Sequence, residues 1–460
     1  MTRRLLAVLV VAFAWFSITD AARAQSIIRD TEIESIIRDW SDPVLDAMGL
    51  VPDDVTILLI NDPSINAFAT RGQIMGLHTG LILEAETPLE LLGVIAHEGG
   101  HIKGRHVQRD GAQNAGMQPF LVSMALGALA VAAGAPDAGA VLMASSPWFG
   151  TIGALQYLQS QEGEADLMGA RALNDAGLSA RGLLRFFERF RFQEVFSDQR
   201  RFPYFRSHPL SDRRIENLRR PVERMSNYNQ PENPQWVAEL ALIHAKIRAF
   251  LEPPNQTFRT YRSTDQSLPA RYARAIAWYR DGQTERALSA IDELIAEDED
   301  NPYFWELRGQ VLFEAGRAAE AVPAHARSVE LMNDAPLLRI NHAHALLQSS
   351  DPADIELALS ELRWASVEEP QNPLAWRLMA DAYGVLGDEG RARLASAELA
   401  YSTGQMRQAR DFALRARDRL DRGSPEWVRA MDIAMQGGVT DEDFQSLDRR
   451  ARNLAPAHNH

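Results

Sequence analysis

The chain has 460 residues, of which 46% are hydrophobic and 24% are charged, and this size and composition predict two or three domains with buried cores. Its formal net charge of −14 argues against nucleic acid and anionic membrane surfaces as partners, because both repel an acidic protein. The chain has no cysteine, so disulfides are excluded and stability must come from packing.

The N-terminus has the pattern of an export signal. Arg3 and Arg4 precede an apolar run over residues 5–18, and Ala22-Arg23-Ala24 follows as a small-residue cleavage site. We expect cleavage after Ala24 and export of the mature chain. The apolar run is short for a membrane span, and no cysteine follows it to carry a lipid anchor. Removal of residues 1–24 leaves a net charge of −16.

The run His97-Glu98-Gly99-Gly100-His101 has the spacing of a zinc site. A proline and recurrent apolar residues over 88–96 predict that it lies in a helix. Because residues i and i+4 share a helix face, His97 and His101 can direct ring nitrogens at one ion, and Glu98 can reach a water on that ion. The pattern predicts metal-assisted hydrolysis. The two glycines each cost about 1 kcal/mol in a helix, and we interpret them as room for close packing.

Residues 116–158 form an apolar segment with Asp137 as its single charged residue. Three interpretations are open: a buried helical hairpin over the active site, a surface that contacts a membrane or an apolar client, and a transmembrane hairpin. We favour the buried hairpin. Each half barely reaches the roughly 20 apolar residues that a span requires, and both ends must return to the same metal site.

A third metal ligand is expected from residues 161–166, which also have a helical pattern. Glu162 and Asp166 share one face of this helix. Glu162 can bind the ion, and Asp166 can accept the outer N–H of a ligand histidine and so fix its tautomer. The alternative is a solvated acidic helix start, which the preceding histidine motif makes the weaker interpretation.

His208 precedes Pro209 on a predicted loop. Three roles are open for it: a surface or capping residue, a fourth zinc ligand that keeps the site latent, or a hydrogen-bond donor to the oxyanion formed during hydrolysis. Two further histidines, His78 and His106, are expected to be structural.

Together these features resemble the BepA-like and HtpX-like gluzincin metallopeptidases of bacterial envelopes. The resemblance extends from residue 55 to residue 220. The matching segments are Asn66-Ala67-Phe68-Ala69, Thr79-Gly80-Leu81-Ile82, His97 to His101 with Arg105-His106, Glu162 to Asp166, and Ser207-His208-Pro209-Leu210 with Arg214-Ile215.

The resemblance implies one Zn²⁺ per chain and assigns roles to these residues. It implies that His97, His101 and Glu162 bind the zinc ion and that Glu98 is the general base. It further implies that a peptide substrate adds as an extra strand to an edge strand formed by Ile74, Met75, Gly76 and Leu77. Gly99-Gly100, Gln73 and Met75 depart from the residues typical of such enzymes, which bears on substrate preference.

The C-terminal part of the chain repeats. Pro302, Pro336 and Pro373 are 34 and 37 residues apart, and small residues recur in the same register. This is a tetratricopeptide (TPR) period, and it predicts stacked helix pairs with a concave face suited to peptides or a partner protein. The recurring small residues are Ala275, Gly309, Ala343 and Ala380, followed by Ala287, Ala321, Ala358 and Ala392.

We therefore predict a mainly α chain with a small β-sheet: an α+β gluzincin metallopeptidase domain followed by an α-solenoid. The predicted parts are a signal peptide at 1–24, the metallopeptidase domain at 25–253, a polar linker at 254–269 and the repeat domain at 270–453. The expected function is zinc-dependent endopeptidase cleavage of misfolded or stalled envelope proteins. The solenoid would bind clients or the outer-membrane protein assembly machinery, and peripheral membrane contact stays open. The alternative is a largely latent protease that acts as a chaperone or assembly factor.

Overall fold

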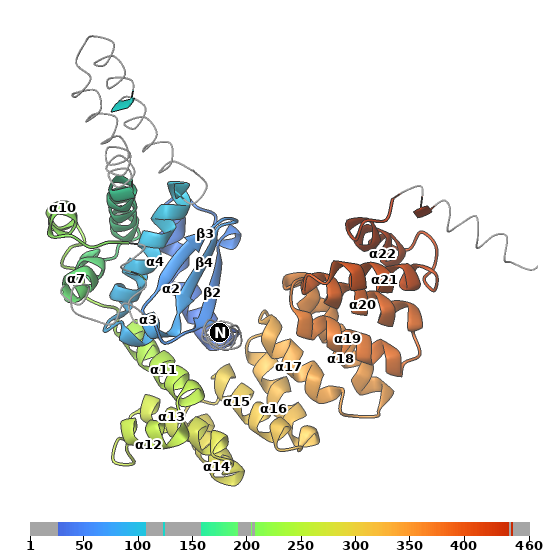
Figure 1. Cartoon of the computed structure of the whole chain (residues 1–460). Coiled ribbons are helices and arrows are strands. Elements are labelled where there is room, and N and C mark those ends of the chain that lie inside the picture. The colour runs from blue at the N-terminus through green and yellow to red at the C-terminus, as the bar shows by residue number, and fades with distance from the viewer. Residues whose placement is uncertain are drawn as a thin grey trace, which may run out of the picture. The chain divides into compact units, whose positions relative to one another are not determined.

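The computed structural model describes residues 26–106, 123–124, 158–191, 204, 208–440 and 443–444. It confirms the predicted fold class, a mainly helical chain with one small sheet (Figure 1). The chain forms two compact units. One contains Ile33–His244 with the residues up to Arg29, and the other contains Asp30–Glu32 with Ala245–His460.

Several predictions about the chain's organisation concern residues that the structure does not describe, so they stay predictions. The predicted signal peptide and nearly all of the apolar segment 116–158 lie outside them. No helix in the described part of the chain is long and apolar enough to cross a membrane. The predicted linker 254–269 includes a short helix, α12 (Pro254–Thr260). The domain boundary at 253–254 stays a prediction.

Four strands form the sheet of the first unit. They are β1 (Ser26–Ile28), β2 (Thr56–Asn61), β3 (Ala67–Thr70) and β4 (Ile74–His78), in the order β1-β2-β4-β3. β2 and β4 pair in parallel, whereas β1 with β2 and β3 with β4 pair antiparallel. β4 is therefore an interior strand, and among the described strands β3 lies at the edge next to it.

The prediction that residues 74–77 form the substrate edge strand is wrong. These residues lie in β4, which pairs with β2 on one side and with β3 on the other. The cause is a tight turn at residues 71–73, where Gly72 and Gln73 have φ angles of 84° and 58° and return the chain as a hairpin. The sequence pattern identified the strand but not its place in the sheet.

The side of β3 that faces away from β4 can be assigned from its hydrogen bonds; just before the strand begins, the Tyr204 N–H donates to Ile65 O at 3.3 Å. The His78 N–H donates to Asn66 O at 3.0 Å, so alternate peptide groups of β3 from this position point towards β4. Because antiparallel ladders alternate, the peptide groups of Ala67 and Ala69 face away from β4. β3 also packs against the helix that carries the histidine motif.

The helices α3 (Thr79–Glu84) and α4 (Pro88–Lys103) contact the strands of this sheet. The other described helices of the first unit are α2 (Thr31–Ala47), the short 3-10 helix Pro52–Asp54, a helix over residues 158–175, α7 (Arg181–Phe190), α10 (Asp212–Val222) and the first part of α11 (Pro234–Leu251), which continues into the second unit. α4 is buried from Pro88 to His101. Its contact with α7 is close, because an added Cβ at Gly93 would lie 2.7 Å from Leu183 Cα. α4 is thus the central helix of the unit.

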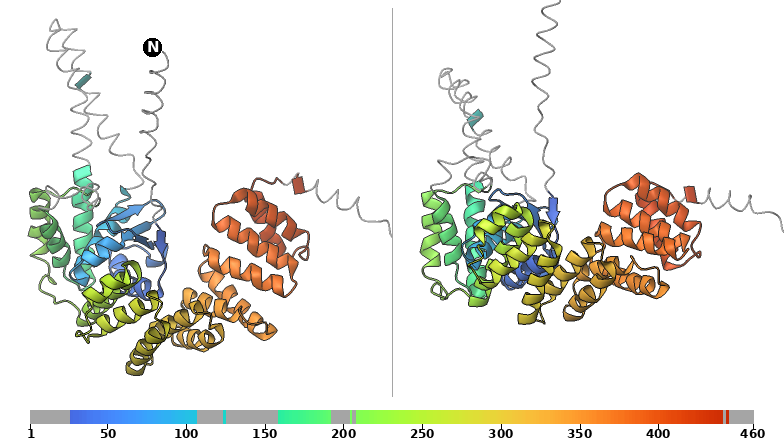
Figure 2. Two further views of the ribbon diagram at one scale, coloured as in Figure 1. Left: turned by 60° about the horizontal axis from the view of Figure 1, so that its bottom comes forward. Right: turned by 90° about the horizontal axis from the view of Figure 1, so that it is seen from below.

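The second unit is a solenoid of antiparallel helix pairs, which follow one another from α13 to α22 (Figures 1 and 2). Pro302, Pro336 and Pro373 each begin the first helix of a pair, which confirms the predicted repeat. The helices are α13 (Leu268–Arg280), α14 (Thr284–Glu297), α15 (Pro302–Glu314), α16 (Ala318–Leu331), α17 (Pro336–Leu346), α18 (Pro352–Glu368), α19 (Pro373–Val385), α20 (Glu389–Ser402), α21 (Met406–Arg417) and α22 (Pro425–Gln436).

The recurring small residues let the helices of the solenoid approach one another. Ala275, Ala343 and Ala358 are fully buried. At Gly309 an added Cβ would lie 2.6 Å from the ring of His325, so the first helix of that pair rests directly on the imidazole of the second. The small residues are therefore required by packing rather than by chemistry.

One buried lysine of the second unit, Lys246, lies among carboxylates. Its Nζ is 2.8 Å from Asp30 Oδ2 and 2.9 Å from Glu32 Oε2. The half-buried Glu306 accepts a hydrogen bond from Asn341 Nδ2 at 3.2 Å. Burial raises the pKa of Glu306 from 4.5 to about 7; Lys246 opposes this rise, and the charges of Asp30 and Glu32 add to it. An ionised Glu306 is thus unfavourable in the folded state.

We expect Glu306→Gln to raise the free energy of unfolding at pH 8 by roughly 1 to 3 kcal/mol. The folded state keeps a proton on Glu306 up to about pH 7, whereas the unfolded carboxyl loses it near 4.5, so the wild type loses stability as pH rises through this window. The gain should shrink below pH 5, where the wild-type carboxyl is also neutral. Urea unfolding at both pH values measures the difference. Glu356→Gln, at a side chain that is 62% exposed, is the control, and equal gains in both variants would contradict the prediction.

Candidate metal centre

Two histidines of α4 meet at one point. The N-terminus of the helix is capped: the Thr87 side chain accepts a hydrogen bond from Glu90 N at 3.3 Å, and Pro88 occupies the first turn. His97 and His101 follow one turn apart on the face that points into the unit, and both are buried. Their Nε2 atoms lie 3.1 Å from each other. The predicted helical spacing therefore brings both ring nitrogens to one place.

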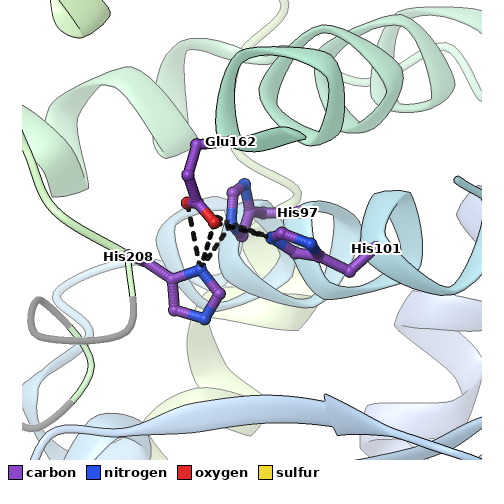
Figure 3. A group of neighbouring side chains, drawn as sticks. All are labelled: His97, His101, Glu162 and His208. Carbon is purple, nitrogen blue, oxygen red and sulfur yellow. Dashed lines mark hydrogen bonds and ion pairs between the residues drawn. The ribbon is translucent and has the colours of Figure 1, made fainter. Parts of the chain in front are cut away.

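Glu162 reaches this point from the helix over residues 158–175. Its Oε1 lies 3.3 Å from His101 Nε2, and its Oε2 lies 3.5 Å from His97 Nε2. Figure 3 shows the four side chains His97, His101, Glu162 and His208 converging from three segments of the chain. One donor atom from each lies within 4.8 Å of the others. The structure thus brings together the three predicted ligands and the proposed fourth.

Glycines set the distance between the two helices that supply these donors. An added Cβ at Gly100 would lie 2.7 Å from Ala165 O, and one at Gly169 would lie 2.9 Å from Ala96 O. The two backbones are in contact at both positions, so any side chain there would separate them. Gly99 differs, since the nearest atoms, at 3.3 Å, are the flexible ends of Leu45 and Met48. Close packing, the predicted reason for the glycines, holds most strongly at Gly100.

His208 completes the cluster and is buried rather than on the surface. Its backbone N–H donates to Tyr204 O at 2.8 Å. Its Nδ1 lies 3.0 Å from Glu162 Oε2 and 3.3 Å from His97 Nε2. Its Nε2 points towards Glu98, with Oε1 at 3.5 Å. One ring nitrogen is therefore among the metal donors, and the other faces the predicted base.

Glu98 is fully buried beside this cluster. Neither of its carboxylate oxygens accepts a hydrogen bond from any residue in the described part of the chain. A buried carboxylate without a hydrogen bond is costly, so Glu98 is expected to have a partner beyond the described residues. A water at the metal position would be such a partner.

The donor set fits a zinc ion. Two imidazoles and one carboxylate are a common set of protein ligands for catalytic zinc. With metal–ligand bonds of about 2.1 Å, the corners of a tetrahedron lie about 3.4 Å apart. The observed separations of 3.1 to 3.5 Å among His97, His101 and Glu162 agree with this spacing.

Asp166 contacts His97 from outside the cluster, at the position predicted for a residue that orients a ligand histidine. Its Oδ1 lies 2.8 Å from His97 Nδ1. Arg214 in turn holds this carboxylate with two bonds, Nε to Oδ2 at 2.7 Å and Nη2 to Oδ1 at 2.8 Å. With Nδ1 engaged in this way, the Nε2 lone pair of His97 faces the donor cluster.

Comparison with known proteins agrees with this geometry. The model of peptidase family M48 matches residues 28–222. This part of the chain belongs to peptidase family M48. Over 379 residues the chain is 25% identical to the beta-barrel assembly-enhancing protease of Yersinia pestis, covering 81% of this chain and 76% of that protein. It is 26% identical over 430 residues to a putative beta-barrel assembly-enhancing protease of Vibrio cholerae, covering 92% and 87%. The metalloprotease LoiP of Escherichia coli is 33% identical over 167 residues, covering 35% and 59%.

Arg214 has contacts at this centre that the sequence did not predict. Besides Asp166, its Nη1 contacts Glu162 Oε2 at 3.0 Å and donates to Pro209 O at 3.1 Å. One guanidinium thus connects a metal ligand, the partner of another ligand, and the loop that carries His208. The sequence marked Arg214 only as part of a matching motif, because the contacts span almost fifty residues of chain.

Charged side chains lie in contact at this centre and shift one another's pKa values. Burial raises the pKa of Asp166, but the charges and hydrogen bonds of Arg214 and His97 together lower it overall, which favours the ionised carboxylate. Burial lowers the pKa of His97, but its hydrogen bonds to Asp166 and Glu162 raise it to about 9. These contacts favour a proton on His97, and ion binding must displace any proton from the nitrogen that binds the ion.

Proposed function

We propose that the chain is an exported zinc-dependent endopeptidase of the periplasm. The observation that carries the proposal is the convergence of His97, His101 and Glu162 beside a buried Glu98 that lacks hydrogen bonds within the described part of the chain. A bound zinc ion would polarise the scissile carbonyl and acidify a water. Membership of residues 28–222 in a peptidase family supports hydrolysis of peptide bonds.

The chain's own residues supply the proton transfers and the orientation. Glu98 takes a proton from the attacking water and passes it to the leaving amine. Asp166 and Arg214 hold His97 in one tautomer and one ring orientation. Because these groups are buried and fixed before substrate arrives, little reorganisation is needed during the reaction.

The substrate edge is assigned to β3 in place of β4. The peptide groups of Ala67 and Ala69 face away from β4, and β3 packs against α4, which carries His97 and His101. A substrate in extended conformation would pair with these peptide groups and so pass beside the metal centre. Such pairing uses main-chain atoms, which suits a protease that acts on unfolded chains of many sequences.

The ligand assignment is tested by metal content. We expect His97→Ala and Glu162→Ala to lower the zinc stoichiometry well below one per chain and to abolish cleavage of an unfolded model protein, because the incomplete donor set binds the ion more weakly. Mass spectrometry under native conditions measures the stoichiometry. Glu216→Gln, at an exposed carboxylate of the same domain, is the control. Unchanged stoichiometry in either variant would remove that residue from the ligand set.

We further propose that the solenoid selects or holds clients during the assembly of outer-membrane proteins. Similarity over most of the chain to beta-barrel assembly-enhancing proteases supports this role. Crosslinking in the native envelope with the solenoid intact, followed by identification of the trapped proteins, tests it. Recovery of periplasmic proteins without any outer-membrane protein or assembly component would contradict it.

The second candidate is a largely latent protease that acts mainly as a chaperone or assembly factor. The position of His208 supports it, since Nδ1 lies at hydrogen-bond distance from Glu162 and His97 and could serve as a fourth donor to a bound ion. A ligand there would exclude substrate until the loop moves. The two candidates differ in how often the site is open, not in its chemistry.

A further inference from the structure

His106 folds back onto the metal ligand His101. The two Nδ1 atoms lie 3.0 Å apart, and the rings meet nearly at right angles, at 79° with centroids 5.0 Å apart. His106 is only 8% exposed. The outer nitrogen of His101 therefore has an imidazole as its partner, where that of His97 has a carboxylate.

The backbone after α4 is shaped to allow this contact. Arg105 has a φ of 55°, in the left-handed region that an arginine rarely adopts. The preceding Gly104 lies under the imidazole, and an added Cβ there would be 2.3 Å from His106 Nε2. An unfavourable backbone conformation and a glycine in close contact together place the ring of His106 against His101.

The contacts also fix which nitrogen carries each proton. If His101 uses Nε2 towards the donor cluster, its Nδ1 carries the hydrogen and must donate. His106 Nδ1 must then accept, which leaves the hydrogen of His106 on Nε2. The carboxylate of Glu164 lies 3.4 Å from that Nε2 and favours this tautomer. The chain of contacts from Glu164 through His106 to His101 is thus consistent in its protons.

We propose that His106 is a positioning residue for zinc, which holds His101 in the tautomer and orientation that binds the ion. The inference rests on the proposed zinc site and assigns a role that sequence reasoning treated as merely structural. The two ligand histidines of α4 would then have different partners on their outer nitrogens. His97 contacts the Asp166 carboxylate, which Arg214 holds, and His101 contacts the imidazole of His106.

The test is zinc affinity, measured on the purified chain by competition with a chelating dye. We expect His106→Ala to raise the dissociation constant by about 10- to 100-fold, the range found when such outer partners are removed. His106→Asn should recover most of the affinity, because its side-chain oxygen lies near the position of Nδ1 and accepts the same hydrogen bond. Gly104→Ala should weaken binding with His106 present, since the methyl group displaces the ring.

The possible outcomes distinguish a failure of the proposed zinc site from a failure of the role given to His106. A wild-type chain that fails to bind zinc would overturn the proposed function. A wild type that binds, with His106→Ala equally tight, would overturn only the role of His106. Equal losses in the alanine and asparagine variants, with the melting temperature of the zinc-free chain lowered in both, would indicate a packing role instead. If His106→Ala does not fold, Gly104→Ala and Glu164→Ala, the latter at a side chain that is 53% exposed, keep the comparison available.

Discussion

The Glu98→Gln variant should cleave an unfolded protein at least about 100-fold more slowly than wild type while keeping its zinc. Glutamine preserves the shape of the side chain but does not accept the proton of the attacking water. Because neither Glu98 oxygen accepts a hydrogen bond from the described residues, the substitution breaks no observed hydrogen bond of the fold. Metal binding and hydrolysis should therefore separate in this variant, whereas His97→Ala and Glu162→Ala should lose both.

Single-turnover cleavage and zinc content, measured on the same preparation, check this result. Glu216→Gln serves again as a control for the loss of one carboxylate elsewhere in the domain. Cleavage by Glu98→Gln at the wild-type rate would exclude Glu98 as the base. Loss of zinc together with activity would show instead that the buried carboxylate is needed to hold the ion.

Replacement of His208 by alanine should raise basal proteolysis. The His208 Nδ1 lies within the donor set, so its removal opens the fourth position to water and substrate. If this imidazole fills that position nine-tenths of the time, the rate should increase about tenfold. We favour this latent role because an exported protease among unfolded clients requires restraint, and because Pro209 stiffens the loop.

Initial rates on an unfolded substrate, at equal zinc content, decide the role of His208. An oxyanion donor would give the opposite sign, a fall of about 100-fold. An unchanged rate would exclude both roles. The double variant Glu98→Gln with His208→Ala is the matched control, because it must stay inactive if the additional cleavage comes from this centre.

The sequence predicted those parts of the site that depend on local geometry. Helical spacing alone relates His97 to His101 and Glu162 to Asp166, and the structure brings these residues together as that spacing requires. The repeat was predictable for the same reason, since small residues at a fixed period report the packing of neighbouring helices. The residues that give the prediction lie within one or two helical turns of each other in the metal site and within one repeat of each other in the solenoid.

The remaining features depend on contacts between distant segments. The place of residues 74–77 inside the sheet follows from the hairpin at 71–73 and from pairing with β2, which no alternation of side chains reveals. Arg214 meets Asp166 across 48 residues. His106 is close to His101 in sequence, but their contact requires a positive φ angle at Arg105, which the sequence does not predict.

The glycines of α4 and of the helix over residues 158–175 place a packing restriction on the histidine motif. The motif allows any residue at its two central positions, but in this chain the space at those positions differs. At Gly99 the neighbours are mobile side-chain ends, whereas at Gly100 the neighbour is the main chain of Ala165. Gly169 imposes the same restriction from the opposite helix. The reach of Glu162 to the histidines in this chain is therefore set by two positions that carry no functional group, and a bulkier residue at either one would move Glu162 away from the histidines without removing any ligand.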